Sequence, residues 1–250
     1  MSTYDQVLQL SDTLNSEWQR YHGTLADGGP VYAETDLSMI IPEPWNALSS
    51  LLILAPALYW AWRLRGEYRK YAFLSFCMPL LFLGGLGSTL FHAFRASSFL
   101  LLMDVLPTAL LTLSVMLFLW YKLLGKWQYL AIILLVFVGL QVAVRYVASP
   151  HTAINLSYFI TGTLIFLPVL LILIRTHWQH LLQIGGALFF FVLSLFFREI
   201  DAWEESLLPM GTHWLWHVST GVGAFLLAEY LYFLYPLDAG LKFKKRKLVS

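Results

Sequence analysis

The stretch GSTLFHAFRASSFLLLMDVLP, residues 87–107, places a serine, a histidine and an aspartate in one of the most apolar parts of the chain. The 250 residues are 58% hydrophobic and 12% charged, with a mean hydropathy of +0.66. A soluble domain is about half apolar and about a quarter charged, so this composition predicts an integral membrane protein. A net charge of +1 points to no nucleic-acid partner, and no motif for a protein partner is evident.

The hydropathy pattern predicts an all-α fold, a bundle of seven transmembrane helices. A helix needs about 20 largely apolar residues to cross a bilayer. Such segments lie at residues 45–63, 72–93, 99–121, 127–147, 153–174, 181–198 and 212–235. We expect one helical domain over 45–235, an acidic segment outside the membrane at 1–44, and a short basic cytosolic tail at 236–250.

Basic residues predict how the bundle is oriented. Twelve of the sixteen Lys and Arg residues fall in alternate loops and in the tail, on one side of the membrane. The other side holds only Arg20, Arg95, Arg145 and Arg198. Because cytosolic loops are enriched in Lys and Arg, we expect the N-terminus outside and the C-terminus inside. The chain would then be a multi-pass protein of a bacterial inner membrane or a eukaryotic endomembrane.

Polar residues of four separate segments converge on the outer end of this predicted bundle. They are Glu43, Asn46, His92, Asp104, His213 and His217. His213 and His217 are four residues apart on a helix, so their rings share one face. Ser88 and His92 have the same spacing. Three histidines with one open position are typical of a catalytic zinc site.

Such a site has a defined chemistry. Zinc lowers the pKa of a bound water to about 7. Asp104 can accept that water's proton and pass it to a leaving group. Ser88 can hydrogen-bond a carbonyl oxygen as negative charge develops on it. We therefore predict a metal hydrolase site that faces the non-cytosolic side.

Each element also has a structural alternative. The histidine pair can be interfacial, His92 can stabilise a helix contact, and Ser88 can pack beside neighbouring glycines. An aspartate inside a membrane span is by default a functional residue. We interpret the charged cluster at 198–205 as a surface loop whose residues pair with one another.

These residues resemble the alkaline ceramidases, within a superfamily of seven-helix hydrolases that includes the adiponectin and progestin receptors. The matching motifs are EPWNALSS (43–50), GGLGSTLFHA (84–93), MDVLP (103–107), FREID (197–201) and HWLWHVSTGVG (213–223). The resemblance implies that His92, His213 and His217 bind zinc, with Ser88 and Asp104 at the catalytic water. It also implies hydrolysis of the amide bond of ceramide to sphingosine and a fatty acid.

The resemblance implies a calcium site as well, to which Glu43 would contribute. The family's acidic cluster before the first helix is absent from GGPVYAETD (28–36). Glu34 and Asp36, with Asn46, are the possible substitutes, because calcium prefers oxygen ligands. The spacing from His92 to Asp104 is also one residue longer than in the animal enzymes.

The sequence thus predicts a zinc-dependent amidohydrolase that acts on ceramide, with calcium as a possible second metal. Two alternatives stay open. One is a related hydrolase that acts on another N-acyl lipid or an ester. The other is a seven-helix lipid receptor in which the zinc site is structural.

Overall fold

A computed structural model describes residues 25–201 and 207–237, and this part of the chain is all-α. Its helices are α2 (Pro44–Arg63), α3 (Ala72–Phe94), α4 (Ser98–Leu124), α5 (Gln128–Val147), α6 (Pro150–Arg175), α7 (Leu181–Asp201) and α8 (His213–Leu234). Each begins and ends within three residues of a segment that hydropathy predicts. The all-α fold and the positions of these helices are therefore confirmed.

The helices differ in how well they suit a membrane. Five, α3 to α7, are long and apolar enough to cross a bilayer. The first and last, α2 and α8, do not reach that hydropathy. Both carry several polar residues, among them Asn46, Ser49 and Ser50 in α2 and the two histidines of α8. These two helices thus supply several of the buried polar groups, alongside α3 and α7.

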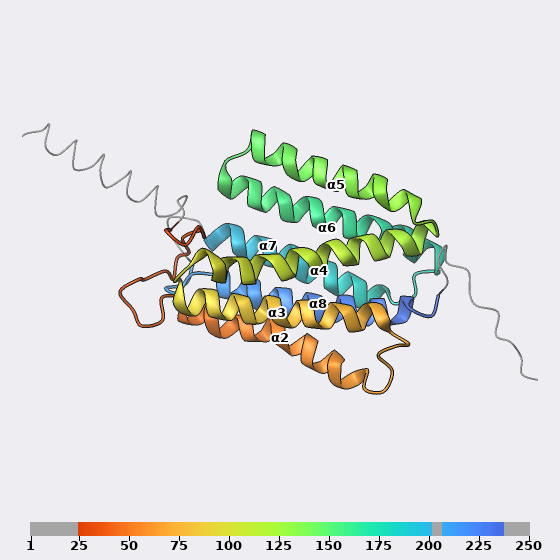
Figure 1. Cartoon of the computed structure of the whole chain (residues 1–250), viewed down its shortest axis with the longest axis horizontal. Coiled ribbons are helices and arrows are strands. Elements are labelled where there is room, and N and C mark those ends of the chain that lie inside the picture. The colour runs from red at the N-terminus through yellow and green to blue at the C-terminus, as the bar shows by residue number, and fades with distance from the viewer. Residues whose placement is uncertain (1–24, 202–206, 238–250) are drawn as a thin grey trace, which may run out of the picture.

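The helices run side by side along the long axis of the molecule (Figure 1). Helix α8 packs against α2 and α7, and α3 packs between α2 and α4. Helix α5 packs only on α4 and α6 and has no buried residue. It therefore forms the outer edge of the bundle. The described chain enters at one end of the bundle and leaves at the other (Figure 1).

The interior of the bundle is divided into two halves. The half near the α2–α3 and α4–α5 connections is a hydrophobic core, with Leu64, Met116, Leu119, Ile172 and Leu234 fully buried. The opposite half buries polar and charged side chains, among them Glu43, Asn46, Ser50, Ser88, His92, Arg95, Asp201, His213 and His217. Burying polar groups is unfavourable unless they have partners, so this second half needs an explanation beyond stability.

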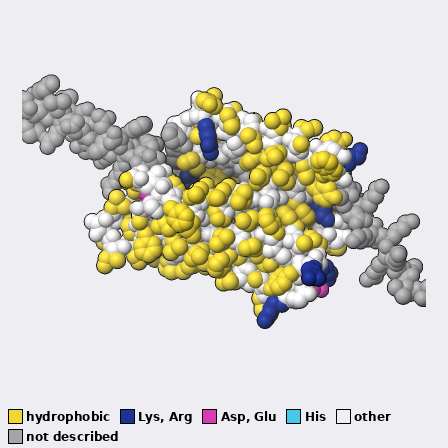
Figure 2. Space-filling model, in the orientation of Figure 1, with side chains coloured by type: hydrophobic (Ala, Val, Ile, Leu, Met, Phe, Trp, Pro, Cys, Tyr) yellow, Lys and Arg dark blue, Asp and Glu magenta, His cyan; other side chains and the backbone are white. Residues whose placement is uncertain are grey.

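Apolar side chains also cover the outside. Large hydrophobic residues such as Leu135, Leu182 and Val147 are more than 70% exposed. Figure 2 shows hydrophobic side chains over most of the visible face, with Lys and Arg mainly toward the ends of the bundle. A soluble monomer rarely exposes contiguous apolar patches larger than a few hundred Å². This surface is that of a protein surrounded by lipid.

Helices α3 and α4 touch backbone to backbone at Gly87. A Cβ atom there would lie 2.2 Å from the carbonyl oxygen of Met103 and 2.7 Å from the amide nitrogen of Asp104. Gly221 of α8 similarly meets the carbonyl oxygen of Leu52 in α2, at 2.7 Å from a hypothetical Cβ. Small residues at such contacts let membrane helices approach closely. The Gly87 contact sets Ser88 beside Asp104.

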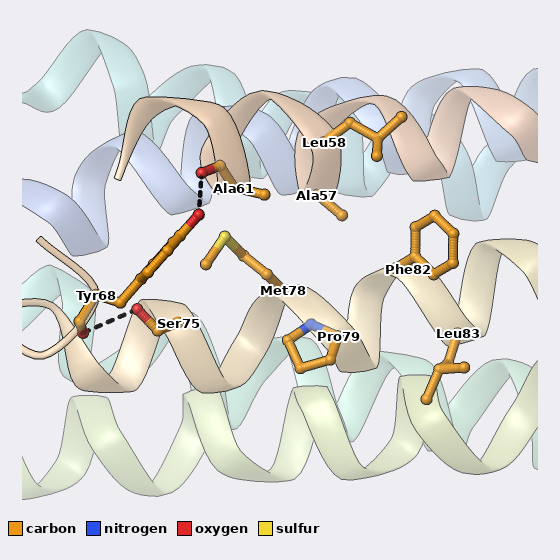
Figure 3. Close-up of a pocket in the computed structure, with 9 residues that line it drawn as sticks. All are labelled: Ala57, Leu58, Ala61, Tyr68, Ser75, Met78, Pro79, Phe82 and Leu83. Carbon is orange, nitrogen blue, oxygen red and sulfur yellow. Dashed lines mark hydrogen bonds between the residues drawn. The ribbon is translucent and has the colours of Figure 1, made fainter. Parts of the chain in front are cut away.

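Helix α2 contains Pro56, and beyond it the helix diverges from α3 (Figure 1). Proline removes a helical hydrogen bond and commonly kinks a helix. An apolar groove of about 490 Å³ lies between the two helices here, lined by residues such as Ala57, Met78 and Phe82. Figure 3 shows Tyr68 closing one end of the groove, where its hydroxyl donates to the carbonyl oxygen of Ala61 at 2.7 Å.

Candidate metal centre

The buried polar half of the bundle is built where α3 ends and where α2 and α8 begin. His92 lies in the last turn of α3, while His213 and His217 occupy the first two turns of α8. The segment that precedes α2 folds over this end of the bundle and adds Asp27, Tyr32 and further groups. Residues far apart in the sequence are brought together because three helix ends meet here.

His92, His213 and His217 form a compact cluster. One ring nitrogen from each lies within 4.8 Å of the others, and all three side chains are buried. Their ring centroids are 4.9 Å apart for His92 and His217 and 4.7 Å for His213 and His217. Within the described residues, this is the one group of three or more His, Cys, Asp or Glu residues that could hold a metal ion.

The free nitrogens of this cluster fit a metal. His92 Nε2 and His213 Nδ1 are buried and have no hydrogen-bond partner among the described residues. His217 Nδ1 is occupied by the hydroxyls of Ser49 at 2.9 Å and Ser50 at 3.2 Å, which leaves its Nε2 for a ligand. Buried polar atoms without partners are rare in folded proteins. Imidazole nitrogens suit zinc, copper, iron and nickel, so the residues present fit the predicted zinc without defining the metal.

Glu43 orients His92. One oxygen of this fully buried carboxylate binds His92 Nδ1, and the other binds Arg95 and the hydroxyl of Thr35. A carboxylate on one ring nitrogen fixes the tautomer and directs the other nitrogen to a metal. Burial alone would raise the pKa of Glu43, but the hydrogen bond to His92 and the charge of Arg95 lower it. The carboxylate is therefore held as an anion.

Arg95 holds Glu43 in turn. It ends α3 in the left-handed conformation, with φ of 46°, and its side chain is buried. Two of its nitrogens donate to Asp27, at 2.7 and 3.0 Å, and another donates to the carbonyl oxygen of Pro30 at 3.0 Å. Burial would raise the pKa of Asp27, yet the hydrogen bonds from Arg95 and the Gly29 amide lower it. Asp27, Arg95, Glu43 and His92 thus form one continuous chain of contacts.

Asp201 and Glu34 fix the starts of α8 and α2. Asp201 accepts hydrogen bonds from the backbone amides of Thr212 at 2.6 Å, His213 at 2.9 Å and Ala33 at 3.2 Å. Glu34 accepts from two backbone amides in the first turn of α2. Carboxylates at helix N-termini satisfy the unpaired amides of the first turn. These caps position the first turn of α8, and with it His213.

Ser88 and Asp104 adjoin the histidines, as the sequence predicts. Ser88 is buried one turn before His92 and accepts a hydrogen bond from Ser50 at 3.1 Å. The Asp104 carboxylate interacts with the Ser88 hydroxyl and with His92. The structure therefore brings together all five residues predicted for the hydrolase site. Their roles in a reaction stay predictions.

Three of the four residues predicted for calcium have other side-chain partners. Glu43 binds His92 and Arg95, and Glu34 caps α2. Asp36 is exposed and accepts hydrogen bonds from Ser38. The side-chain amide of Asn46 is buried, and neither of its polar atoms has a partner in the described part of the chain. The calcium site stays a prediction.

The surface interpretation of residues 198–205 is wrong for two of its members. Arg198 is 8% exposed and Asp201 is 3% exposed. Both face the interior because α7 continues to Asp201, one turn beyond the end that hydropathy predicts. Glu199 is exposed and binds Asn155 of α6, while Glu204 and Glu205 lie outside the described residues. Sequence analysis also missed Asp27, Arg95 and Tyr32 as site residues.

Tyr32 covers the cluster from the segment before α2. Its ring stacks on His213, with centroids 3.9 Å apart, and lies 5.3 Å from the His92 ring. Burial raises the pKa of Tyr32, so its hydroxyl stays protonated and can donate a hydrogen bond. No motif of the sequence marks this tyrosine, because its position depends on how the preceding segment folds back.

No protein-family model matches the chain, and a search of curated proteins gives no match either. The resemblance to the alkaline ceramidases therefore rests on the motifs alone. The metal centre rests on an independent observation, the convergence of three buried histidines.

We predict that Glu43→Gln lowers metal affinity by about 10–100-fold, the usual effect of removing a partner of a ligating histidine. The amide keeps the shape of the side chain but is a weaker acceptor for His92 and no longer neutralises Arg95. Competition with a metal chelator would measure the affinity. Glu67→Gln is the matched control, because that side chain is exposed on the α2–α3 loop. Unchanged affinity in Glu43→Gln would show that this contact does not support the metal centre.

Proposed function

We propose that this chain is a zinc-dependent hydrolase embedded in a membrane, which cleaves the amide bond of ceramide to give sphingosine and a fatty acid. The observation that carries the proposal is the buried cluster of His92, His213 and His217. His92 and His213 each have a ring nitrogen without a partner. Hydrogen bonds to the second ring nitrogens of His92 and His217 hold those two rings in place. The motifs shared with the alkaline ceramidases supply the substrate class.

Zinc would be held by the three histidines. When bound, it supplies a Lewis acid that polarises a carbonyl group and makes water acidic enough to react at neutral pH. A neutral imidazole is the form that binds metal, and Glu43 and the α2 serines hold the His92 and His217 rings in place through their second nitrogens. A site with three protein ligands leaves a position open, as catalytic zinc sites do.

Ser88 and Asp104 would handle the reacting groups. In amide hydrolysis a water oxygen adds to the acyl carbon, the carbon–nitrogen bond breaks, and the nitrogen gains a proton. The Asp104 carboxylate can accept a proton from the water and deliver it to the departing nitrogen. The Ser88 hydroxyl can donate a hydrogen bond to the carbonyl oxygen.

Asp104 lies on a part of α4 that opens toward the membrane. Buried residues of α4 begin only at Val115, and neighbours of Asp104 such as Leu102 and Val105 are about half exposed. We propose that a lipid approaches the site across this face, from the bilayer and without crossing water. A lipid substrate suits this geometry better than a soluble one.

We further propose seven membrane spans, with the metal centre on the non-cytosolic side. The described loops at the opposite end of the bundle, with the helix turns that adjoin them, hold Arg63, Arg65, Arg69, Lys70, Lys122, Lys126 and Arg175. Cytosolic loops are enriched in Lys and Arg, which supports this orientation.

Orientation is tested by tags at the two termini of the full chain in sealed membranes. We expect the N-terminal tag to be cleaved by a protease added from outside and the C-terminal tag to be protected. A C-terminal tag that alone is cleaved would reverse the orientation and place the metal centre on the cytosolic side.

The metal and the reaction are tested together on the purified protein. We expect one zinc per chain and release of fatty acid from ceramide, with both lost in His213→Ala because one of three ligands is removed. His177→Asn is a control outside the cluster, since asparagine tolerates the positive φ of 51° found there. Zinc without hydrolysis of ceramide, other N-acyl lipids or esters would favour the receptor with a structural site.

A second variant separates catalysis from metal binding. We expect Asp104→Asn to lower turnover by about 10²–10⁴-fold, the usual contribution of general acid–base catalysis. Zinc content should stay normal, because Asp104 is not one of the proposed ligands. The control is Glu67→Gln, a carboxylate on the α2–α3 loop, away from the histidine cluster. Full turnover in Asp104→Asn would place the proton transfer elsewhere, and loss of zinc would make Asp104 part of the metal site.

A further inference from the structure

Among the described residues, Arg198 is a buried cation with no carboxylate in direct contact. It lies in the last turn of α7 and is 8% exposed, and none of the ion pairs among the described residues includes it. Its Nε donates to the side-chain oxygen of Asn155 at 3.1 Å. The guanidinium lies 5.5 Å from the ring centres of both Tyr158 and Trp216. These neighbours are uncharged.

The other buried arginine of this end is different. Arg95 contacts two carboxylates, Asp27 and Glu43, which balance its charge. A buried charge is strongly unfavourable unless it is paired and hydrogen-bonded. Aromatic rings, one amide oxygen and the carboxylates of Asp201 and Asp104, which form no ion pair with it, compensate only part of that penalty for Arg198. The imbalance indicates that an anion from outside the chain completes the site.

Arg198 also lies beside the histidine cluster. Trp216, which it contacts, is stacked on His213 with centroids 6.3 Å apart and planes 10° apart. Tyr32, whose ring stacks on His213, also interacts with the guanidinium through its hydroxyl. Arg198 interacts electrostatically with His213, His217 and Asp104. An anion bound here would therefore sit next to the reacting groups.

We propose that Arg198, with the Tyr32 hydroxyl and Asn155, forms a binding site for the carboxylate or phosphate of a lipid at the metal centre. The planar guanidinium matches such groups with two parallel hydrogen bonds. The inference rests on the proposed function for the lipid nature of the ligand. The anion has two possible sources. It is the fatty-acid carboxylate that amide cleavage creates, or it is an acidic group already present on an N-acyl lipid substrate.

Binding is tested first, without turnover, on the zinc-loaded full chain in detergent. Oleate and oleyl alcohol have the same chain and differ in charge. We expect oleate to bind more tightly, by about 10-fold or more, as for a hydrogen bond to a charged group. Arg198→Gln should abolish that difference while zinc content stays unchanged. Arg145→Gln is the matched control, an exposed arginine at the same end of the bundle.

Two results would overturn the proposal. One is equal binding of oleate and oleyl alcohol by the unaltered protein. The other is an oleate preference that persists in Arg198→Gln. Should that variant fail to fold, Arg198→Lys carries the test, because it keeps the charge and loses the paired donors. The expected result is then a reduced preference for oleate, and an undiminished preference contradicts the proposal.

Kinetics then identify the source of the anion. If the anion belongs to the substrate, Arg198→Gln lowers kcat/KM for N-oleoylglycine more than for N-oleoyl sphingosine. If the anion is the product carboxylate, the variant leaves the ratio of the two kcat/KM values unchanged and weakens inhibition by oleate. Either result supports the anion site, and an unchanged ratio with unchanged inhibition overturns it. Charge-dependent oleate binding without any hydrolysis would refute the proposed function and leave the anion site intact.

Discussion

One buried carboxylate, Glu43, organises the polar end of this bundle. It binds His92 with one oxygen and Arg95 with the other, so a neutral metal ligand and a cation share a single anion. Arg95 extends the chain of contacts to Asp27, in the segment before α2. Removing one partner of a buried ion pair typically costs about 3–5 kcal/mol, because the other charge is left without compensation. The covering segment, the end of α3 and the orientation of His92 are therefore linked energetically.

The separation of the interior into an apolar half and a polar half explains the composition of the helices. Helices α2 and α8 run through both halves and supply several of the buried polar groups, so they are less hydrophobic than their neighbours. Helix α5 supplies none and lies at the edge of the bundle. The polar half is held by hydrogen bonds and caps, and the apolar half provides the packing against which those groups are fixed.

The sequence predicted what depends on local periodicity. The helix positions follow from runs of apolar residues, and the convergence of His92, His213 and His217 follows from alternating helix directions. The burial of Arg95 and Arg198 could not be predicted, because the sequence does not distinguish a buried arginine from one on the surface. Asp201 binds the amide of His213, twelve residues further along the chain, and no periodic pattern marks that contact. Tyr32 was missed for a similar reason, since an irregular segment carries it.

The contact at Gly87 limits which substitutions the protein can accept during evolution. No side chain separates α3 from α4 where their main chains meet, so the separation of Ser88 and Asp104 depends on two backbones and not on packing. Surrounding apolar residues can be exchanged for others of similar volume without moving that pair. Residue 87 has no such freedom, because any side chain would push the helices apart. The apolar surroundings can therefore diverge among descendants of this sequence while the spacing of the two groups stays constant.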